Sequence, residues 1–290
     1  GVGVQIRVVG VFLDAPQATL AGITDIQLSG TGAGFRIHTA TRAGGAVMTF
    51  EIRGNAVSGL RRLDMDLLGA GYGVPAPSAL VPASVGGQPA YWLAGPWQDR
   101  LGGFVIGPDG SLSGFEPVRG APGGAVSTLA LVTVGGVEYA YAGLSGAAGL
   151  LQYRVGNRWE LVEDLPAHGA FQGVDLRGLE TVVLGGSTYL LAVSAGQDAL
   201  RSFRVGADGR LDPVASLGAA GGMGLADPTA FEVVRMGGAS YATVAGAGSS
   251  TLSVVRLLDD GRMVLTDHLG DTRDTRFQGV QAVATVALGD

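Results

Sequence analysis

The chain has 290 residues, a formal net charge of -6 and an isoelectric point near 5.0. The acidic balance and the lack of a basic cluster argue against nucleic-acid binding. Cysteine is absent, which excludes disulfides and cysteine-ligated metal sites, and no apolar run approaches the ~18 residues of a membrane span.

The N-terminal part of the chain, up to Leu63, is predicted to form strands and no helix. An apolar stretch, Val2 to Leu13, reads as an isolated strand. Four further strand-length segments follow, with Gly54-Asn55 as the turn between the last two; they are Thr24 to Leu28, Phe35 to Thr39, Val47 to Arg53 and Val57 to Leu63. We interpret these four segments as the first copy of a repeated unit.

The rest of the chain repeats this unit with a period near 50 residues. Gly-Gly turns begin at positions 86, 135, 185 and 237, which are 49, 50 and 52 residues apart. Gly-Gly between two apolar runs predicts a tight hairpin, because such turns need positive φ. A tyrosine follows each turn, and we expect these four to occupy equivalent positions: Tyr91, Tyr139, Tyr189 and Tyr241.

Each of these copies continues with a third and a fourth strand. The expected third strands are Gly103 to Ile106, Leu150 to Val155, Leu200 to Val205 and Leu252 to Leu257. The turn into the fourth strand is Asp-Gly at positions 109, 208 and 260, and Gly156-Asn157 takes its place in one copy. A sixth copy begins at Val280 to Leu288 and is cut off at Gly289-Asp290.

This pattern predicts the fold class. Four short strands per ~50-residue repeat are typical of a β-propeller, in which stacked antiparallel sheets bury both faces of their middle strands. We therefore predict a single all-β domain over residues 1–290, with five complete four-stranded blades and a truncated sixth. The first strand of each blade would line a central channel, and the loops between second and third strands would lie at one end of it.

The repeated motif also carries a family resemblance. The run GG-x-x-Y-x-x-x-A-G, a polar loop, L-x-x-F/Y-R-V and D-G-x-L resembles the N-terminal propeller of bacterial hemolysin-type calcium-binding (RTX) proteins. More distantly, it is similar to lactonase-type seven-bladed propellers. The resemblance implies a secreted or cell-surface bacterial protein, a parent of about seven blades, and calcium bound only in repeats downstream. On this view Val2 to Leu13 would complete a last blade that lies beyond Asp290, and the chain alone would form an open or distorted ring.

The loops between second and third strands are the first candidate for function. They contain Trp97, Gln98, Asp99 and Arg100 in one blade, and Gln197 and Asp198 in another. A tryptophan beside an Asp-Arg pair would stack on a sugar ring and hydrogen-bond its hydroxyls. Exposed loops on a rigid scaffold are where binding usually occurs, although polar tips are expected in any propeller.

Polar residues on the first strands are the second candidate group: Asp25, Gln27, Glu180, Glu232 and Gln281. Lactonase-like enzymes work inside the channel with acidic, arginine or histidine groups. The neighbouring residues here are mostly Leu, Val, Ala and Thr, so the catalytic pattern of that family does not transfer position by position.

Other motifs indicate structure more than chemistry. Residues 221–227 come close to the calcium-binding nonapeptide, but Ala226 stands where an Asp ligand is needed, so we expect a loop between blades. His38, His168 and His268 lack metal-ligand spacing. His268, with Asp267, Asp271 and Asp274 near it, has the partner that a general base would need, but a solvated blade edge explains it better. Ser145 lies outside a G-x-S-x-G elbow.

We therefore expect a binding or scaffolding module for glycans or protein partners, with no cofactor, no metal and no assigned catalytic residue. The alternative is a lactonase-like hydrolase that acts in the channel. A catalytic site would require ionisable side chains that converge with perturbed pKa values, whereas a binding protein needs only a polar rim.

Overall fold

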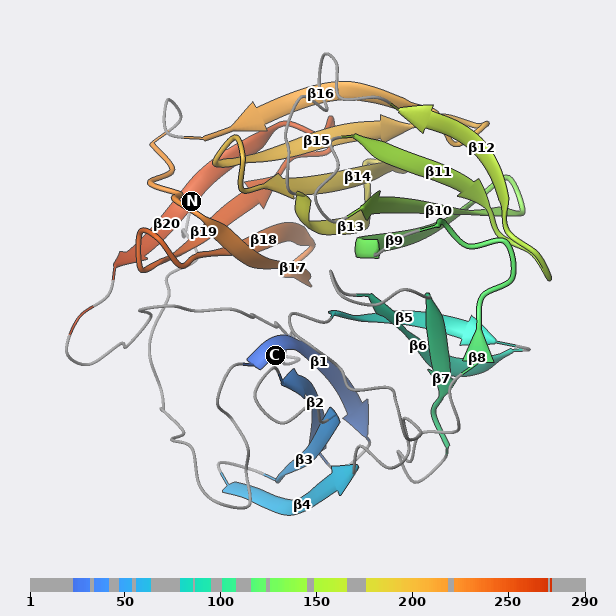
Figure 1. Ribbon diagram of the computed structural model, residues 1–290. Helices are drawn as coiled ribbons and strands as arrows, with labels where there is room; N and C mark the ends of the chain where they lie inside the picture. Colours follow the sequence, from blue (N-terminus) through green and yellow to red (C-terminus); the bar gives the residue numbers. More distant parts are fainter. Residues whose placement is uncertain are drawn as a thin grey trace. The chain divides into compact units, whose positions relative to one another are not determined.

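The computed structural model describes residues 23–31, 34–41, 47–53, 56–63, 79–85, 87–94, 101–107, 116–123, 126–144, 149–165, 176–218, 222–270 and 272. The regular structure of these residues is β-strand, arranged as five antiparallel sheets of four strands (Figure 1). Among them, no helix has the length and hydrophobicity needed to cross a bilayer. The all-β, four-stranded prediction is confirmed.

Each sheet is one blade of the predicted repeat, with its strands hydrogen-bonded in chain order. Blade 1 comprises β1 (Ile23–Thr31), β2 (Gly34–Thr41), β3 (Val47–Arg53) and β4 (Ala56–Leu63). Blade 2 comprises β5 (Ala79–Val85), β6 (Gln88–Ala94), β7 (Gly102–Val105) and β8 (Glu116–Pro117). Blade 3 comprises β9 (Val126–Val134), β10 (Val137–Leu144), β11 (Leu150–Arg154) and β12 (Glu160–Leu165).

Blade 4 comprises β13 (Leu176–Leu184), β14 (Ser187–Ser194), β15 (Ala199–Val205) and β16 (Leu211–Leu217), and blade 5 comprises β17 (Pro228–Met236), β18 (Ala239–Gly246), β19 (Thr251–Leu257) and β20 (Met263–Gly270). The Gly-Gly turns link the first two strands of blades 3, 4 and 5, as predicted. Both glycines of each turn have positive φ, for example 53° and 80° at Gly185 and Gly186. A two-residue hairpin of this kind needs positive φ at both positions.

Both edges of several blades carry irregularities in register. The first strands of blades 1, 4 and 5 shift at the same place relative to their hairpin, for example between Leu176 and Gly178. The fourth strands of blades 1, 3, 4 and 5 shift against the third strands. Bulges of this kind bend an edge strand and make it a poor template for pairing with another chain.

The contacts divide the described chain into two compact units. One contains residues 128–156 and 160–272, which include blades 4 and 5 and most of blade 3. The other contains residues 23–127 and 157–159, which include blades 1 and 2. The prediction of a single domain over residues 1–290 stays a prediction.

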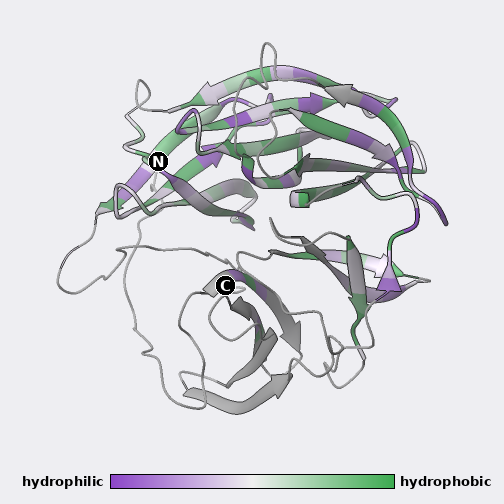
Figure 2. Ribbon diagram, viewed as in Figure 1, coloured by the Kyte–Doolittle hydropathy of each residue, from purple (hydrophilic) through white to green (hydrophobic). Residues whose placement is uncertain are grey.

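The middle strands of the first unit are buried on both faces. Leu190 and Leu191 are neighbours on β14, point to opposite faces, and are both fully buried. Leu190 packs in a cluster with Tyr139 and Tyr141 of blade 3, whereas Leu191 packs in a cluster with Phe231 and Val244 of blade 5. Hydrophobic residues accordingly run along these strands (Figure 2). This arrangement explains why the sequence shows apolar runs there and not a clean alternation.

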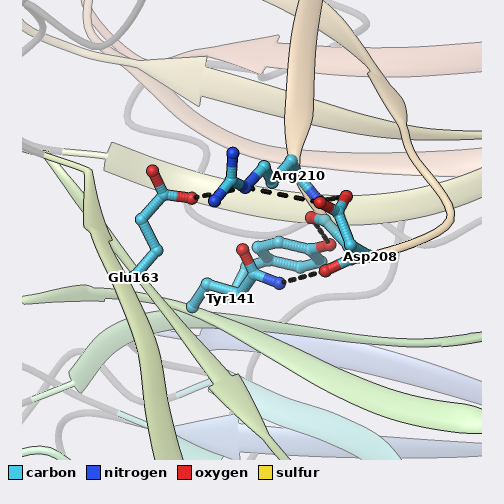
Figure 3. Close-up of polar contacts among 6 residues, drawn as sticks. Tyr141, Glu163, Asp208 and Arg210 are labelled. Atoms are coloured by element: carbon cyan, nitrogen blue, oxygen red, sulfur yellow. Dashed lines mark hydrogen bonds and ion pairs between the residues drawn. The ribbon is translucent and has the colours of Figure 1, made fainter.

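In this unit, the Asp-Gly turns of blades 4 and 5 each fit against the preceding blade. Between blades 3 and 4, the Tyr141 hydroxyl donates to the Gly209 carbonyl and the Gln152 side-chain amide donates to the Asp208 carbonyl at 3.2 Å. Arg210 pairs with Asp208 at 3.4 Å and lies 4.0 Å from Glu163 of blade 3 (Figure 3). Hydrogen bonds and ion pairs thus fix the Asp-Gly turn at this joint.

The same joint recurs between blades 4 and 5. The Ser202 hydroxyl donates to the Gly261 carbonyl at 2.6 Å, and Ser202 and Gln152 are equivalent in the repeat. Gly261 has φ 84°, and a Cβ placed there would lie 2.4 Å from the ring of Tyr189. Only glycine can both adopt this positive φ without strain and leave room for the Tyr189 ring. The Asp-Gly motif is therefore set by packing between blades as well as by turn geometry.

The four tyrosines do not all occupy equivalent positions, and here the sequence prediction is wrong for one of them. Tyr139, Tyr189 and Tyr241 are each the third residue of their strand, but Tyr91 is the fourth residue of β6. Since side chains alternate between faces, this one-residue offset places Tyr91 on the opposite face. It pairs across the sheet with Phe104, as Leu190 pairs with Phe203 in blade 4.

Two sequence predictions lie outside the described residues. They concern the strand expected at Val2 to Leu13 and the sixth copy at Val280 to Leu288. The count of a truncated sixth blade and of about seven blades in a parent protein therefore stays a prediction, as does the open ring.

Candidate functional site

The polar residues predicted to lie on first strands do lie there. Counted back from the hairpin, Gln27, Glu180 and Glu232 occupy the same position of β1, β13 and β17. In β5 and β9 this position is taken by Val81 and Ala130. The repeat scaffold therefore does not require a polar side chain at this position. Gln281 lies outside the described residues.

Glu180 serves as an acceptor for the backbone of the next blade. Its two carboxylate oxygens lie 3.2 and 3.1 Å from the Val233 amide nitrogen, which donates to them from β17. The first strand of a blade is an edge, so its outward N–H groups have no partner within their own sheet. The carboxylate of Glu180 satisfies one of these groups and ties β13 to β17.

In the other unit, Asp25 likewise accepts a backbone amide of the next blade. Its carboxylate accepts hydrogen bonds from the Leu80 amide on β5, from the Ile26 amide at 2.8 Å and from the Gln27 side chain at 3.4 Å. Burial raises the pKa of the Asp25 carboxyl to about 7, and the three hydrogen bonds oppose that shift. A carboxyl with this pKa exchanges its proton near neutral pH.

Two buried residues that sequence analysis did not single out complete this cluster. His38 is 2% exposed and Tyr91 is 4% exposed, and their rings meet edge to face with centroids 5.5 Å apart. His38 pairs with Gln27 across β1 and β2. Burial raises the pKa of Tyr91 to about 12, and the nearby negative charge of Asp25 adds to the shift. We call Asp25, Gln27, His38 and Tyr91 the blade 1–2 cluster.

A signal for this cluster was present in the sequence. Three residues separate Gly87 from Tyr91, whereas two separate Gly136 from Tyr139 and Gly186 from Tyr189. The extra residue moves Tyr91 to the face that meets His38. Counting from the hairpin rather than aligning tyrosines would have revealed the change of face.

The loop between β14 and β15 is the described part of the predicted rim. Asp198 has φ 46°, a left-handed conformation that Asp tolerates better than most residues, and it is exposed. Its carboxylate accepts a hydrogen bond from the Asp227 amide at 3.0 Å. Asp227 in turn lies 3.7 Å from the Arg177 guanidinium. Neighbouring segments therefore hold this loop in place.

Gln197 lies beside Asp198 in the same loop. Its side-chain carbonyl oxygen is buried, and no residue in the described ranges donates a hydrogen bond to it. The other predicted rim residues, Trp97, Gln98, Asp99 and Arg100, lie outside the described residues. The structure therefore brings Gln197 and Asp198 together with Arg177 and Asp227, and it leaves the tryptophan loop untested.

The remaining sequence candidates have structural roles where they are described. The loop that contains Asp227 connects β16 to β17, as expected for the calcium-like segment. His268 contacts the buried Ser253 hydroxyl through Nδ1 at 2.8 Å, and the Asp267 carboxylate accepts the His268 backbone amide. Among the described residues, no three His, Cys, Asp or Glu side chains are grouped so that they would hold a metal ion.

Comparison with known proteins identifies the fold. No family model matches the sequence, and no curated protein matches it. The periplasmic gluconolactonase PpgL of Pseudomonas aeruginosa matches with a TM-score of 0.56 and 18% identity, over 87% of this chain and 71% of that chain. A GH43_1 enzyme from Xanthomonas citri matches with a TM-score of 0.57 and 13% identity, over 86% of this chain and 93% of that chain.

A mutant of AofleA from Arthrobotrys oligospora is also similar, with a TM-score of 0.56 and 15% identity, over 91% of this chain and 74% of that chain. At these identities the likeness establishes the fold alone. The chain has a β-propeller fold of four-stranded antiparallel blades, and the lactonase-type part of the resemblance holds at the level of architecture.

Proposed function

We propose that this chain is a non-catalytic carbohydrate-binding propeller that uses the loops between the second and third strands of its blades. The observation that carries the proposal is that the carboxylates of Glu180 and Asp25, on first strands, bind backbone amides of the next blade. Glu180 accepts the Val233 amide and Asp25 accepts the Leu80 amide, so both act as ties between blades. A hydrolase that worked in the channel would need such groups to face its substrate.

The β14–β15 loop supports a rim site. A binding loop that is already ordered loses less conformational entropy when a ligand arrives. The Asp198 carboxylate is fixed by the Asp227 amide, and its second oxygen is available to accept from a sugar hydroxyl. Trp97 would supply a stacking surface in the corresponding loop of blade 2.

Sugars are the first ligand class to test. Structures of the similar Xanthomonas citri GH43_1 enzyme have been described in complexes with xylose and xylotriose. The likeness to that enzyme concerns the fold, so it supports the choice of ligand class and no residue correspondence.

A second candidate function is favoured by one observation. The Asp25 carboxyl, with a pKa near 7, lies with His38 and Tyr91 between the first two blades. A proton donor of this kind would serve a lactonase-like hydrolase, because general acids work best near the operating pH. Asp25 would then be the acid, and Glu180 would keep its structural role.

We retain the secreted or cell-surface bacterial location, and the RTX relationship, as parts of this proposal. The periplasmic location named for the Pseudomonas aeruginosa gluconolactonase agrees with such a location. Calcium would bind in repeats downstream and not in this propeller.

The test is a glycan array followed by titration of the best ligand. We expect Trp97→Ala and Asp198→Ala to weaken binding about 10-fold or more, as loss of a stacking or charged hydrogen-bonding group does. Asp212→Ala, at an exposed position of β16, is the matched control and should bind normally. Turnover of a lactone panel that Asp25→Asn abolishes would replace this proposal with the hydrolase.

A further inference from the structure

A cavity lies at the hairpin end of blades 4 and 5, away from the rim loops. Its volume is about 430 Å³, within the ~300–1,000 Å³ range of small-molecule sites. The Gly185-Gly186 hairpin forms one wall, and Arg235, Ser240, Arg256 and Asp259 of blade 5 line the other side. Since β14 runs from this hairpin to the loop of Asp198, the cavity and the rim lie at opposite ends of that strand.

Strand register places two of the lining side chains on the face of blade 5 that meets blade 4. Arg235 pairs with Ser240, and Ser240 pairs with Leu257, so these three residues share a face. Leu257 belongs to the cluster that joins blades 4 and 5. Arg256 is next to Leu257 and starts from the other face, so it borders the cavity from the side. Both arginines line the cavity, and Arg235 is the one that starts from the face toward blade 4.

The charged side chains of the cavity are not paired with one another. Within the described residues, the guanidinium groups of Arg235 and Arg256 form no hydrogen bond or ion pair, and neither does the Asp259 carboxylate. Two other arginines of this unit have partners, whereas Arg154 of blade 3 has none within the described residues. Arg204 donates to the Ser187 hydroxyl at 3.2 Å, and Arg262 pairs with Asp260 at 2.6 Å.

The repeat offers an internal comparison that separates scaffold from function. In blade 4, the positions of Arg235, Ser240 and Asp259 are occupied by Val183, Thr188 and Ala207. Blade 4 forms the same hairpins and the same Asp-Gly joint without these charges. The propeller scaffold therefore does not explain why Arg235 and Asp259 are present in blade 5.

We propose that this cavity binds an acidic monosaccharide, a hexuronate. The carboxylate would pair with Arg235, flanked by Arg256, because guanidinium groups match carboxylates in shape and charge. Asp259 and Ser240 would hydrogen-bond the sugar hydroxyls. A simple anion such as sulfate fits this set less well, since it has no hydroxyl to offer Asp259 and is repelled by it. Among the residues that the structure describes, no aromatic side chain lines the cavity, so recognition rests on charge and hydrogen bonds.

This site is independent of the proposed rim site. Binding at one end of the strands requires nothing of the loops at the other end. Failure of the glycan array with neutral sugars would leave the hexuronate site intact, and loss of hexuronate binding would leave rim binding intact.

The experiment is isothermal titration of the whole chain with sodium glucuronate, glucose and sodium sulfate at fixed ionic strength. We expect saturable 1:1 binding of glucuronate and none of glucose. Arg235→Ala should weaken glucuronate about 10-fold or more, the change expected for losing a hydrogen bond to a charged group. Arg204→Ala is the matched control, because Arg204 is the blade 4 equivalent of Arg256 and does not line the cavity.

The outcomes separate cleanly. Glucuronate binding that depends on Arg235 and not on Arg204 supports the site. Asp259→Ala should then reduce the preference for glucuronate over sulfate. Equal binding of sulfate and glucuronate would mean an adventitious anion only, and would overturn the sugar class. Glucuronate binding that survives in a folded Arg235→Ala variant, checked by circular dichroism, would overturn the site.

Discussion

The joint between blades 4 and 5 and the joint between blades 1 and 2 use the same backbone device in different surroundings. In each, a first-strand carboxylate accepts an amide of the next first strand: Glu180 from Val233, and Asp25 from Leu80. The layer behind Glu180 is apolar and includes Leu191, Val193 and Val244. The layer behind Asp25 contains Gln27, His38 and Tyr91.

This difference shows that one repeated joint can be filled either by apolar side chains, which favour stability, or by ionisable side chains, which are capable of chemistry. A joint filled mainly by close-packed apolar side chains gains free energy from their burial. A joint that contains a carboxylic acid, a histidine and a tyrosine pays for burying polar groups and responds to pH. The four predictions that follow test the contrast, from the largest expected effect to the smallest.

The apolar joint should be the more sensitive to truncation of an aromatic ring. Tyr189 is 4% exposed and packs in the cluster between blades 4 and 5. Tyr189→Ala should lower the free energy of unfolding by about 3–5 kcal/mol, the range for aromatic-to-alanine changes in a core. Chemical denaturation measures it, with Tyr189→Phe as the control that keeps the ring. A loss below about 1 kcal/mol would show that the two blades are not packed as described.

The Asp-Gly joint should be intolerant of a single methyl group. Gly261→Ala puts a Cβ 2.4 Å from the Tyr189 ring at φ 84°, so it suffers both a clash and backbone strain. Gly238→Ala has a comparable φ of 75° with nothing within 4 Å of the added carbon. We expect the control to cost about 1–2 kcal/mol from the left-handed backbone alone, and Gly261→Ala to cost at least about 1 kcal/mol more. Equal losses in thermal melts would refute the packing argument.

The polar joint should make stability depend on pH. The folded-state pKa of Asp25, about 7, lies above its ordinary value of 3.8, so the folded chain holds this proton more tightly than the unfolded chain. The resulting stabilisation is full below about pH 4 and is lost as the pH rises to about 7. Between pH 5 and pH 8 we expect a loss of about 2.5 kcal/mol, because nearly two pH units of the difference lie in this window at ~1.4 kcal/mol per unit.

Asp25→Asn should remove this part of the pH dependence, because the amide oxygen still accepts the Leu80 amide but does not titrate. Denaturation of both proteins across pH 4–8 gives the difference directly. Parallel curves for the two proteins would contradict a raised pKa at Asp25.

The tie at Glu180 should have the smallest effect. Glu180→Ala leaves the Val233 amide without its acceptor, at a cost of about 1–2 kcal/mol. Glu180→Gln retains an acceptor oxygen and should recover at least half of that loss. Denaturation reports the stability, and hydrogen exchange of the Val233 amide reports the bond itself. Unchanged exchange in the alanine variant would exclude Glu180 as its partner.

The sequence alone determined the blade architecture in this protein. Gly-Gly and Asp-Gly turns need positive φ, and apolar runs of strand length between them leave little alternative to antiparallel hairpins. The predicted strands of blade 1 match β1 to β4 closely, even though that copy is the most divergent. First-strand polar residues such as Glu180 were also found by sequence, because they interrupt an otherwise apolar pattern.

Only the tertiary structure decided what those residues do. Whether Glu180 faces a channel or the Val233 amide depends on where the next blade lies, and that relation is long-range. A one-residue offset in β6 places Tyr91 on the other face, next to His38. Secondary-structure propensity does not reveal this change of face. The cavity of Arg235 and Asp259 likewise exists only because two hairpins from different blades meet, whereas in sequence these residues are ordinary charges near turns.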